Sequence, residues 1–307
     1  MNWDHLKYFQ KVALSQNFTL AAKELYITTA ALSKAIHTLE KELGFPLFEK
    51  QGRNSVLTEY GMLFAQHVTA ALEELDIGIQ EVYNRVGLIK GHIKMSGNWT
   101  MSGGFLPERI KAFRTLYPEV TYFTKYEITS KVIRNVIDRM SDLGFCGDYS
   151  EEDENYSGLE RTLLYTEELV IIVPKDHWMT NSKYVNFQEL KNEDFISFRM
   201  VNAGGVYEAF YDLCVKHEFR PQIVYEAIDD HAVVSTVAAG LGVALVPNSK
   251  YLSLRDVVAI PFRENKPIRH QYVIWRKNGY LAPVAKAFRD FVTSTTIYER
   301  DSKRTFL

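Results

Sequence analysis

The chain has 307 residues, of which 46% are hydrophobic and 24% are charged, and its formal net charge is −2. These values predict a globular protein with two or three domains. A membrane-spanning helix is excluded because no run of about 20 apolar residues is present, and the two cysteines are too few for a disulfide framework or a cysteine-rich zinc site.

The amino-terminal segment differs in charge from the segment that follows it. Asp4 and Lys7 stand where a secretory signal peptide would have an uninterrupted apolar core, so we expect a cytoplasmic protein. Residues 1–58 hold seven Lys or Arg against five acids, whereas residues 59–90 hold two against five. The change from a basic to an acidic segment predicts a domain boundary at Thr58.

Three short helices are predicted within the first 44 residues. Apolar residues at helical spacing predict a first helix that ends before Asn17. We expect Thr19 to cap a second helix that runs to Leu25, and Thr28 to cap a third helix that Gly44 ends. Two short helices joined by a tight turn, the second of them amphipathic, are typical of a helix-turn-helix that binds the DNA major groove.

The third predicted helix has an apolar face and an opposite polar face. The polar face consists of Thr29, Ser33, Lys34, His37 and Lys41. Hydroxyl groups and cations in this arrangement are typical of a recognition helix, although a solvated surface helix has the same spacing.

The segment after the third helix, GFPLFEKQGRNSVLT, predicts a wing. A turn from Lys50 to Arg53 around Gly52 is followed by a short strand over residues 55–57. Cations at the tip of such a wing contact phosphates or enter the minor groove. We therefore expect an amino-terminal DNA-binding domain over residues 1–58.

This region resembles the winged helix-turn-helix of LysR-type transcriptional regulators. The resemblance rests on FTLAAKEL at residues 18–25, ALSKAIHTLEKELGFPLF at residues 31–48 and GRNSVLTEYG at residues 52–61. It implies a sequence-specific regulator of transcription that binds double-stranded DNA. It also implies that Ser33, Lys34 and His37 contact the groove and that Arg53 acts from the wing.

Two parts of the segment depart from the family pattern. The family has Ser-Gln-Pro where this chain has Thr28, Thr29 and Ala30, and arginine where it has Lys50. Thr29 is too short for the bidentate contact that glutamine makes with adenine, and Lys50 keeps the charge of arginine without its planar fork. Thr28, Thr29 and Lys50 remain DNA-binding candidates. At Thr29 we expect a base preference that differs from the family's preference for adenine.

Residues 59–90 predict a long helix followed by a hinge. Its apolar residues recur at a spacing that alternates between three and four: Phe64, Val68, Ala71 or Leu72, Leu75, Ile79, Val82 and Val86. This spacing is typical of a coiled-coil seam, and a buried core helix is the alternative. In the family the corresponding helix pairs two subunits, so the resemblance implies a homodimer or homotetramer.

From Gly91 onward, strand and helix patterns alternate and predict an α/β fold. We expect one lobe over residues 91–163, completed by residues 266–300, and a second lobe over residues 164–265. LLYTEELVIIVPKDHW and VAAGLGVALVP resemble the effector domain of LysR-type regulators, which is similar to periplasmic solute-binding proteins. The resemblance implies a small-molecule effector bound between two lobes.

A ligand in such a fold lies at strand ends and helix N-termini, which favour an anion. The candidate effector contacts are Trp99, Thr100, Ser102, Thr129, Ser130, Arg199, Asn202 and His231. In the family, a Ser or Thr that matches Thr100 contacts the effector. Each candidate also has a purely structural alternative: a helix cap for the hydroxyl residues, a surface ion pair for Arg199, and packing for Trp99.

Other classes of function have weaker support in the sequence. No HExxH, phosphate-binding loop or G-x-S-x-G turn is present, so we expect neither an enzyme nor a cofactor or metal. A redox-responsive regulator would use Cys146 and Cys214, but neither cysteine belongs to a C-x-x-C pair. A regulator that binds DNA without any effector is the remaining alternative.

Overall fold

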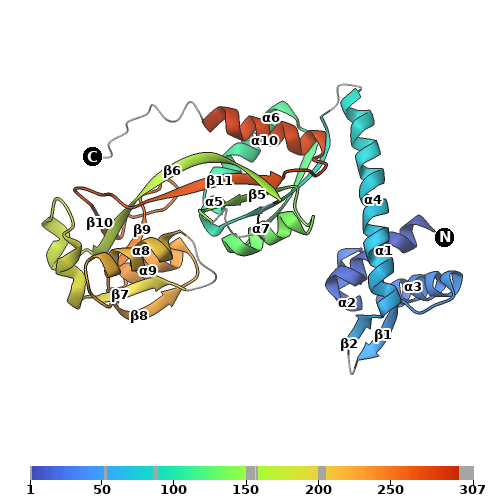
Figure 1. Ribbon diagram of the computed structural model, residues 1–307, viewed down its shortest axis with the longest axis horizontal. Helices are drawn as coiled ribbons and strands as arrows, with labels where there is room; N and C mark the ends of the chain where they lie inside the picture. The colour runs from blue at the N-terminus through green and yellow to red at the C-terminus, as the bar shows by residue number, and fades with distance from the viewer. Residues whose placement is uncertain are drawn as a thin grey trace. The chain divides into compact units, whose positions relative to one another are not determined.

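The computed structural model describes residues 2–51, 54–85, 89–149, 156, 158–199 and 205–296. The chain forms two compact units, residues 1–82 and 83–307 (Figure 1). No helix among the described residues is long and apolar enough to cross a membrane.

The first unit begins with three helices around one apolar core. They are α1 (Trp3–Ser15), α2 (Phe18–Glu24) and α3 (Thr29–Leu43). Phe9, Leu32 and Leu39 are fully buried at their centre. The predicted ends of α3 are confirmed, because Thr28 accepts a 3.1 Å hydrogen bond from the amide of Ala31 and Gly44 ends the helix in the left-handed region at φ 82°.

The predicted cap of the second helix is wrong. Asn17, not Thr19, occupies the N-cap of α2, with an extended backbone and a side-chain oxygen that accepts a 3.0 Å hydrogen bond from the amide of Leu20. Asparagine is at least as good an N-cap as threonine, and the helix therefore starts two residues earlier than Thr19 would allow.

The wing follows α3 and is anchored to it. Strands β1 (Phe48–Gln51) and β2 (Asn54–Leu57) pair antiparallel, with Phe48 opposite Leu57. Oε1 of Glu40 on α3 accepts hydrogen bonds from the amides of Leu47 at 2.8 Å and Phe48 at 3.2 Å. Helix α3 thereby fixes the position at which the wing begins.

Helix α4 (Glu59–Arg85) starts at a cap that connects it to the wing. The hydroxyl of Thr58 accepts a 2.9 Å hydrogen bond from the amide of Gly61 and donates one of 2.8 Å to the carbonyl of Pro46. Gly61 is required here, because a Cβ at this position would lie 2.1 Å from the carbonyl oxygen of Leu47.

The apolar row of α4 divides into two parts. Phe64, Val68 and Leu72 pack into the core of the first unit. Leu75, Ile79 and Val82 are 49%, 49% and 60% exposed, and Val86 lies outside the described residues. The second half of the row is therefore an apolar surface that the described residues leave uncovered.

The second unit has two α/β lobes that share long strands (Figure 1). In the first lobe, β3 (Gly91–Gly97) pairs in parallel with β4 (Val120–Tyr126) and β5 (Leu143–Cys146). The helices of this lobe are α5 (Trp99–Ser102), α6 (Phe105–Leu116), α7 (Thr129–Ile137) and α10 (Pro283–Thr296). Helices α6 and α10 cover one face of the sheet and α7 covers the other.

Strand β6 (Leu159–Pro174) runs from the first lobe into the second. Its first part pairs with β11 (Ile268–Arg276), and its last part pairs with β9 (Ala244–Pro247) and β10 (Val257–Pro261). Strand β11 also pairs with β5, so the chain returns to the first sheet.

The second lobe is completed by a separate parallel pair of strands and by helices around it. These elements are β7 (Asp194–Phe198), β8 (Gln222–Ala227), α8 (Val206–Lys216), α9 (Asp230–Ala238) and the short 3-10 helices η2 (Trp178–Asn181) and η3 (Phe187–Asn192). The mixed α/β, two-lobed architecture agrees with the fold predicted from the sequence.

Candidate functional site

The polar face of α3 is open to solvent in the first unit. Thr28, Thr29, Ser33, Lys34 and His37 are all exposed, and so is Lys50 on β1; Arg53 lies outside the described residues. Nδ1 of His37 lies 3.7 Å from Oε2 of Glu40, the residue whose other carboxylate oxygen holds the start of the wing. Glu40 therefore contacts both His37 on the exposed face of α3 and the backbone at the start of the wing.

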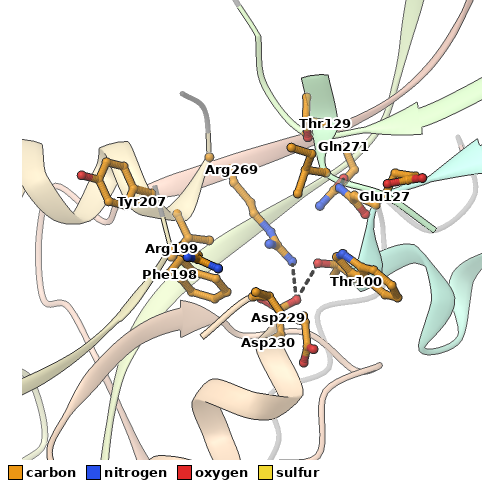
Figure 2. A pocket seen from close by; sticks show the side chains of 17 residues that line it. Thr100, Glu127, Thr129, Phe198, Arg199, Tyr207, Asp229, Asp230, Arg269 and Gln271 are labelled. Atoms are coloured by element: carbon orange, nitrogen blue, oxygen red, sulfur yellow. Dashed lines mark hydrogen bonds and ion pairs between the residues drawn. The ribbon is translucent and has the colours of Figure 1, made fainter. Parts of the chain in front are cut away.

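A cavity of about 160 Å³ lies within the second unit and is lined from both lobes (Figure 2). Four candidates from the sequence line it: Trp99, Thr100, Thr129 and Arg199. Arg199 is exposed, and its guanidinium forms no ion pair with the described residues.

The remaining effector candidates are placed elsewhere. The hydroxyl of Ser102 donates a 2.5 Å hydrogen bond to the carbonyl of Trp99 within α5, and Ser130 does not line the cavity. His231 lines a separate open groove with Lys175 and Asp176. Asn202 lies outside the described residues.

A buried ion cluster forms one wall of the cavity. Oγ1 of Thr100 donates a 2.5 Å hydrogen bond to Oδ2 of Asp230, which also lies 3.6 Å from Nη2 of Arg269 (Figure 2). Nε of Arg269 donates a 2.7 Å hydrogen bond to Oε2 of Glu167. Burial alone would lower the pKa of Arg269, but the carboxylates of Asp230 and Glu167 raise this pKa by more, so the guanidinium stays charged.

Two buried donors at the cavity lack hydrogen-bond acceptors among the described residues. Gln271 is fully buried; its Oε1 accepts a 2.9 Å hydrogen bond from Nδ2 of Asn98, whereas its Nε2 has no partner. Arg269 is 6% exposed, and its Nη2 forms no hydrogen bond but lies 3.6 Å from Oδ2 of Asp230 as an ion pair. Unsatisfied buried donors are costly, so a ligand with acceptor oxygens would be stabilised here.

Two helix N-termini at the cavity also lack side-chain caps among the described residues. Ile128 and Gly205 occupy the N-caps of α7 and α8 and make no side-chain cap hydrogen bond. By contrast, Oδ1 of Asp229 caps α9 by accepting a 2.9 Å hydrogen bond from the amide of Ala232. The uncapped amides of α7 and α8 add donors and a positive dipole end to the site.

Sequence reasoning did not assign Asp230 to an ion cluster and did not find Arg269 or Gln271. The available signal was in the segment IRHQYV, where Arg269 and Gln271 are two residues apart on a predicted strand. Residues two apart share one face of a strand, and β11 points both of these polar side chains into buried space. Their partners lie more than 30 residues away in sequence, at Asp230, Glu167 and Asn98.

The two cysteines lie in hydrophobic cores rather than at the surface. Cys146 is fully buried and Cys214 is 2% exposed. Burial raises the pKa of the Cys146 thiol well above its ordinary value and raises the pKa of Cys214 to about 12. Both environments disfavour the thiolate that a redox sensor needs.

Comparison with protein families gives two matches, one in each unit. Residues 3–62 match the model of the bacterial regulatory helix-turn-helix protein, lysR family, and residues 87–296 match the model of the LysR substrate binding domain. The chain is 31% identical over 295 residues to the HTH-type transcriptional regulator YybE of Bacillus subtilis, covering 96% of this chain and 99% of that protein. It is also 31% identical over 294 residues to the transcriptional dual regulator GltC of Bacillus subtilis, covering 95% and 96%.

Solved structures share the fold. CbnR, a LysR family transcriptional regulator, has a TM-score of 0.68 at 20% identity, covering 96% of this chain and 99% of that chain. The effector binding domain of QuiR in complex with shikimate has a TM-score of 0.62 at 24% identity, covering 68% of this chain and 98% of that chain.

Proposed function

The chain belongs to the LysR family of bacterial helix-turn-helix transcriptional regulators, and we propose that a small carboxylate-bearing effector controls it from the cavity around Arg269 and Gln271. In this proposal the polar face of α3 and the wing bind the operator. The effector domain then changes that binding, or its effect on transcription, when the cavity is occupied.

The single observation that carries the effector assignment is the pair of unsatisfied buried donors. Nε2 of Gln271 and Nη2 of Arg269 have no hydrogen-bond acceptor among the described residues, and both side chains line the cavity. A carboxylate supplies two acceptor oxygens, and the uncapped N-terminus of α7 favours its negative charge. QuiR, which shares the fold, binds shikimate, itself a carboxylic acid, in its effector domain.

The cavity also limits the size of the effector. Its volume is about 160 Å³, and an apolar cavity of about 150 Å³ holds one benzene molecule. An effector of roughly six to ten non-hydrogen atoms therefore suits this site better than a nucleotide or a peptide.

For the DNA-binding part, Ser33, Lys34 and His37 present one hydroxyl and two basic groups from a single exposed helix face. Hydroxyl and basic side chains bind base edges and phosphates in the major groove. The exposed Leu75, Ile79 and Val82 on α4 would pair with the same residues of a second copy, so the regulator acts as a homodimer or a dimer of dimers in the cytoplasm. It regulates and does not catalyse.

Binding of the purified full chain to fragmented genomic DNA of its source organism tests the DNA-binding role. We expect enrichment of discrete sites with inverted symmetry, as a two-fold dimer requires. Ser33→Ala should lose those sites, whereas Lys286→Ala, an exposed change on α10, should keep them. Uniform recovery of fragments by the unmodified chain would contradict the proposed function.

A further inference from the structure

We propose that the effector carries an ammonium group as well as its carboxylate, as amino acids do, and that Asp229 and Asp230 bind this ammonium. The inference rests on the proposed function and names the chemical class of its effector. It follows from the charge of the cavity wall and from the position of Asp229 and Asp230 on the side of the cavity opposite Thr129 and Gln271.

The charged groups at the cavity do not fit a purely anionic ligand. Among the described residues that line it, Arg199 and Arg269 face three carboxylates, those of Glu127, Asp229 and Asp230. Glu127 is compensated from outside the cavity by Lys131, whose Nζ lies 3.6 Å from Oε2. Asp229 has no cationic partner among the described residues.

The buried cluster behind this wall carries an excess negative charge. Arg269 supplies one positive charge, whereas Glu167 and Asp230 each supply a negative charge, and all three side chains are 6–7% exposed. A buried charge without a partner is costly, and Arg269 cannot fully compensate two carboxylates. A positively charged group on the ligand would neutralise the remaining negative charge of the cluster.

The two aspartates lie on one side of the cavity, whereas the donors Thr129 and Gln271 lie on the other side, together with Glu127, which Lys131 compensates. Thr129, at the N-terminus of α7, and Gln271 lie above Arg269 in Figure 2, whereas Asp229 and Asp230 lie below it at the start of α9. Oδ2 of Asp229 and Oδ1 of Asp230 accept no hydrogen bond from the described residues. A ligand carboxylate is therefore stabilised on the α7 side and repelled on the α9 side, where an ammonium is stabilised.

Matched sets of small acids test the inference at pH 7. The sets are propionate, butyrate and glutarate, each beside its 2-amino and 2-hydroxy counterparts, with 4-aminobutyrate added. Thermal shift of the full chain ranks the compounds, and calorimetric titration then gives Kd for the best set. We expect one amino-bearing acid to bind at least about tenfold more tightly than the matching plain acid, as a charge-assisted hydrogen bond to a carboxylate provides.

Two variants assign the preference to the proposed residues. Asp230→Asn keeps an acceptor for Thr100 but removes the charge, and Asp229→Asn keeps a good N-cap for α9. Each should reduce the amino-over-plain preference severalfold, whereas Asp256→Asn, outside this cavity, should leave it unchanged. Should Asp230→Asn fail to fold, Asp229→Asn still provides the test.

Other outcomes separate the inference from the proposed function. Plain or hydroxy acids that bind as tightly as their amino counterparts would overturn the ammonium assignment while leaving a carboxylate effector in place. An amino preference that persists in both variants would overturn the role of Asp229 and Asp230. A complete absence of binding across the sets would contradict both the inference and the carboxylate effector.

Discussion

The hydroxyl of Thr100 on α5 donates a 2.5 Å hydrogen bond to Asp230 on α9, and this bond joins the first lobe to the second at the cavity. The two residues are 130 positions apart in sequence. Asp230 also faces Arg269 on β11. A ligand that binds the Asp230 carboxylate therefore alters its hydrogen bond with Thr100 and its ion pair with Arg269.

Removing this cross-lobe hydrogen bond should destabilise the effector domain. Thr100→Val keeps the shape of the side chain but removes the donor to a buried carboxylate, which costs about 1–3 kcal/mol. We expect a thermal midpoint lower by several degrees. Thr100→Ser, which keeps the hydroxyl, should remain close to the unmodified chain. Equal midpoints for all three proteins would show that the bond contributes nothing.

Ser33 should discriminate between DNA sequences, because its hydroxyl stands on the exposed face of α3. Ser33→Ala should weaken binding to the operator by about 1–3 kcal/mol and binding to random DNA much less. Lys50→Ala should instead weaken both and reduce the slope of log affinity against log salt by about one. Fluorescence anisotropy at several salt concentrations measures both effects; an equal loss on both sequences for Ser33→Ala would exclude base readout.

The exposed half of α4 should hold two subunits together. Ile79→Asp would place an uncompensated charge in the apolar row, and sedimentation should then show dissociation to monomers. Gln66→Asp adds the same charge at an exposed polar position of the same helix and should leave the assembly intact. Leu72 is unsuitable for this test, because it packs in the core of the first unit. An unaltered assembly in Ile79→Asp would place the subunit interface elsewhere.

Neither cysteine should react in the folded protein. Burial raises the pKa of the thiol of Cys214 to about 12 and that of Cys146 still further, so almost no thiolate is present at pH 8. Mass spectrometry after iodoacetamide treatment should find both thiols unmodified in the native chain and both alkylated in guanidinium. Rapid modification or oxidation of either cysteine in the native chain would instead support the alternative that the protein is a redox-responsive regulator.

Local sequence signals predicted the first unit well, because its elements are specified by neighbouring residues. Thr28 and Gly44 mark the ends of α3 through contacts within four residues. The same reasoning failed for α2, since Asn17 and Thr19 are both acceptable caps and the local sequence does not distinguish them. The spacing in α4 predicted one continuous seam, but it could not show that Val68 and Leu72 belong to the core of the first unit.

The effector cavity was only partly predictable for a different reason. Thr100, Thr129 and Arg199 follow strands or open helices, and such positions are recognisable from local patterns. Arg269 acquires its role from partners in β6 and α9, and Gln271 acquires its role from Asn98. A single sequence contains no signal for these pairings, so the residues that give the cavity its polarity were found only in the structure.

We expect occupation of the cavity to control DNA binding by the other unit. The most direct measurement is the operator affinity or footprint of the full chain with and without the acid that binds it most tightly. Gln271→Leu removes the unsatisfied donor, and Gln188→Leu, an exposed site, is the control. We predict that the acid changes operator binding by the unmodified chain and by Gln188→Leu, whereas Gln271→Leu binds the operator normally but no longer responds. An identical response in Gln271→Leu would contradict the account.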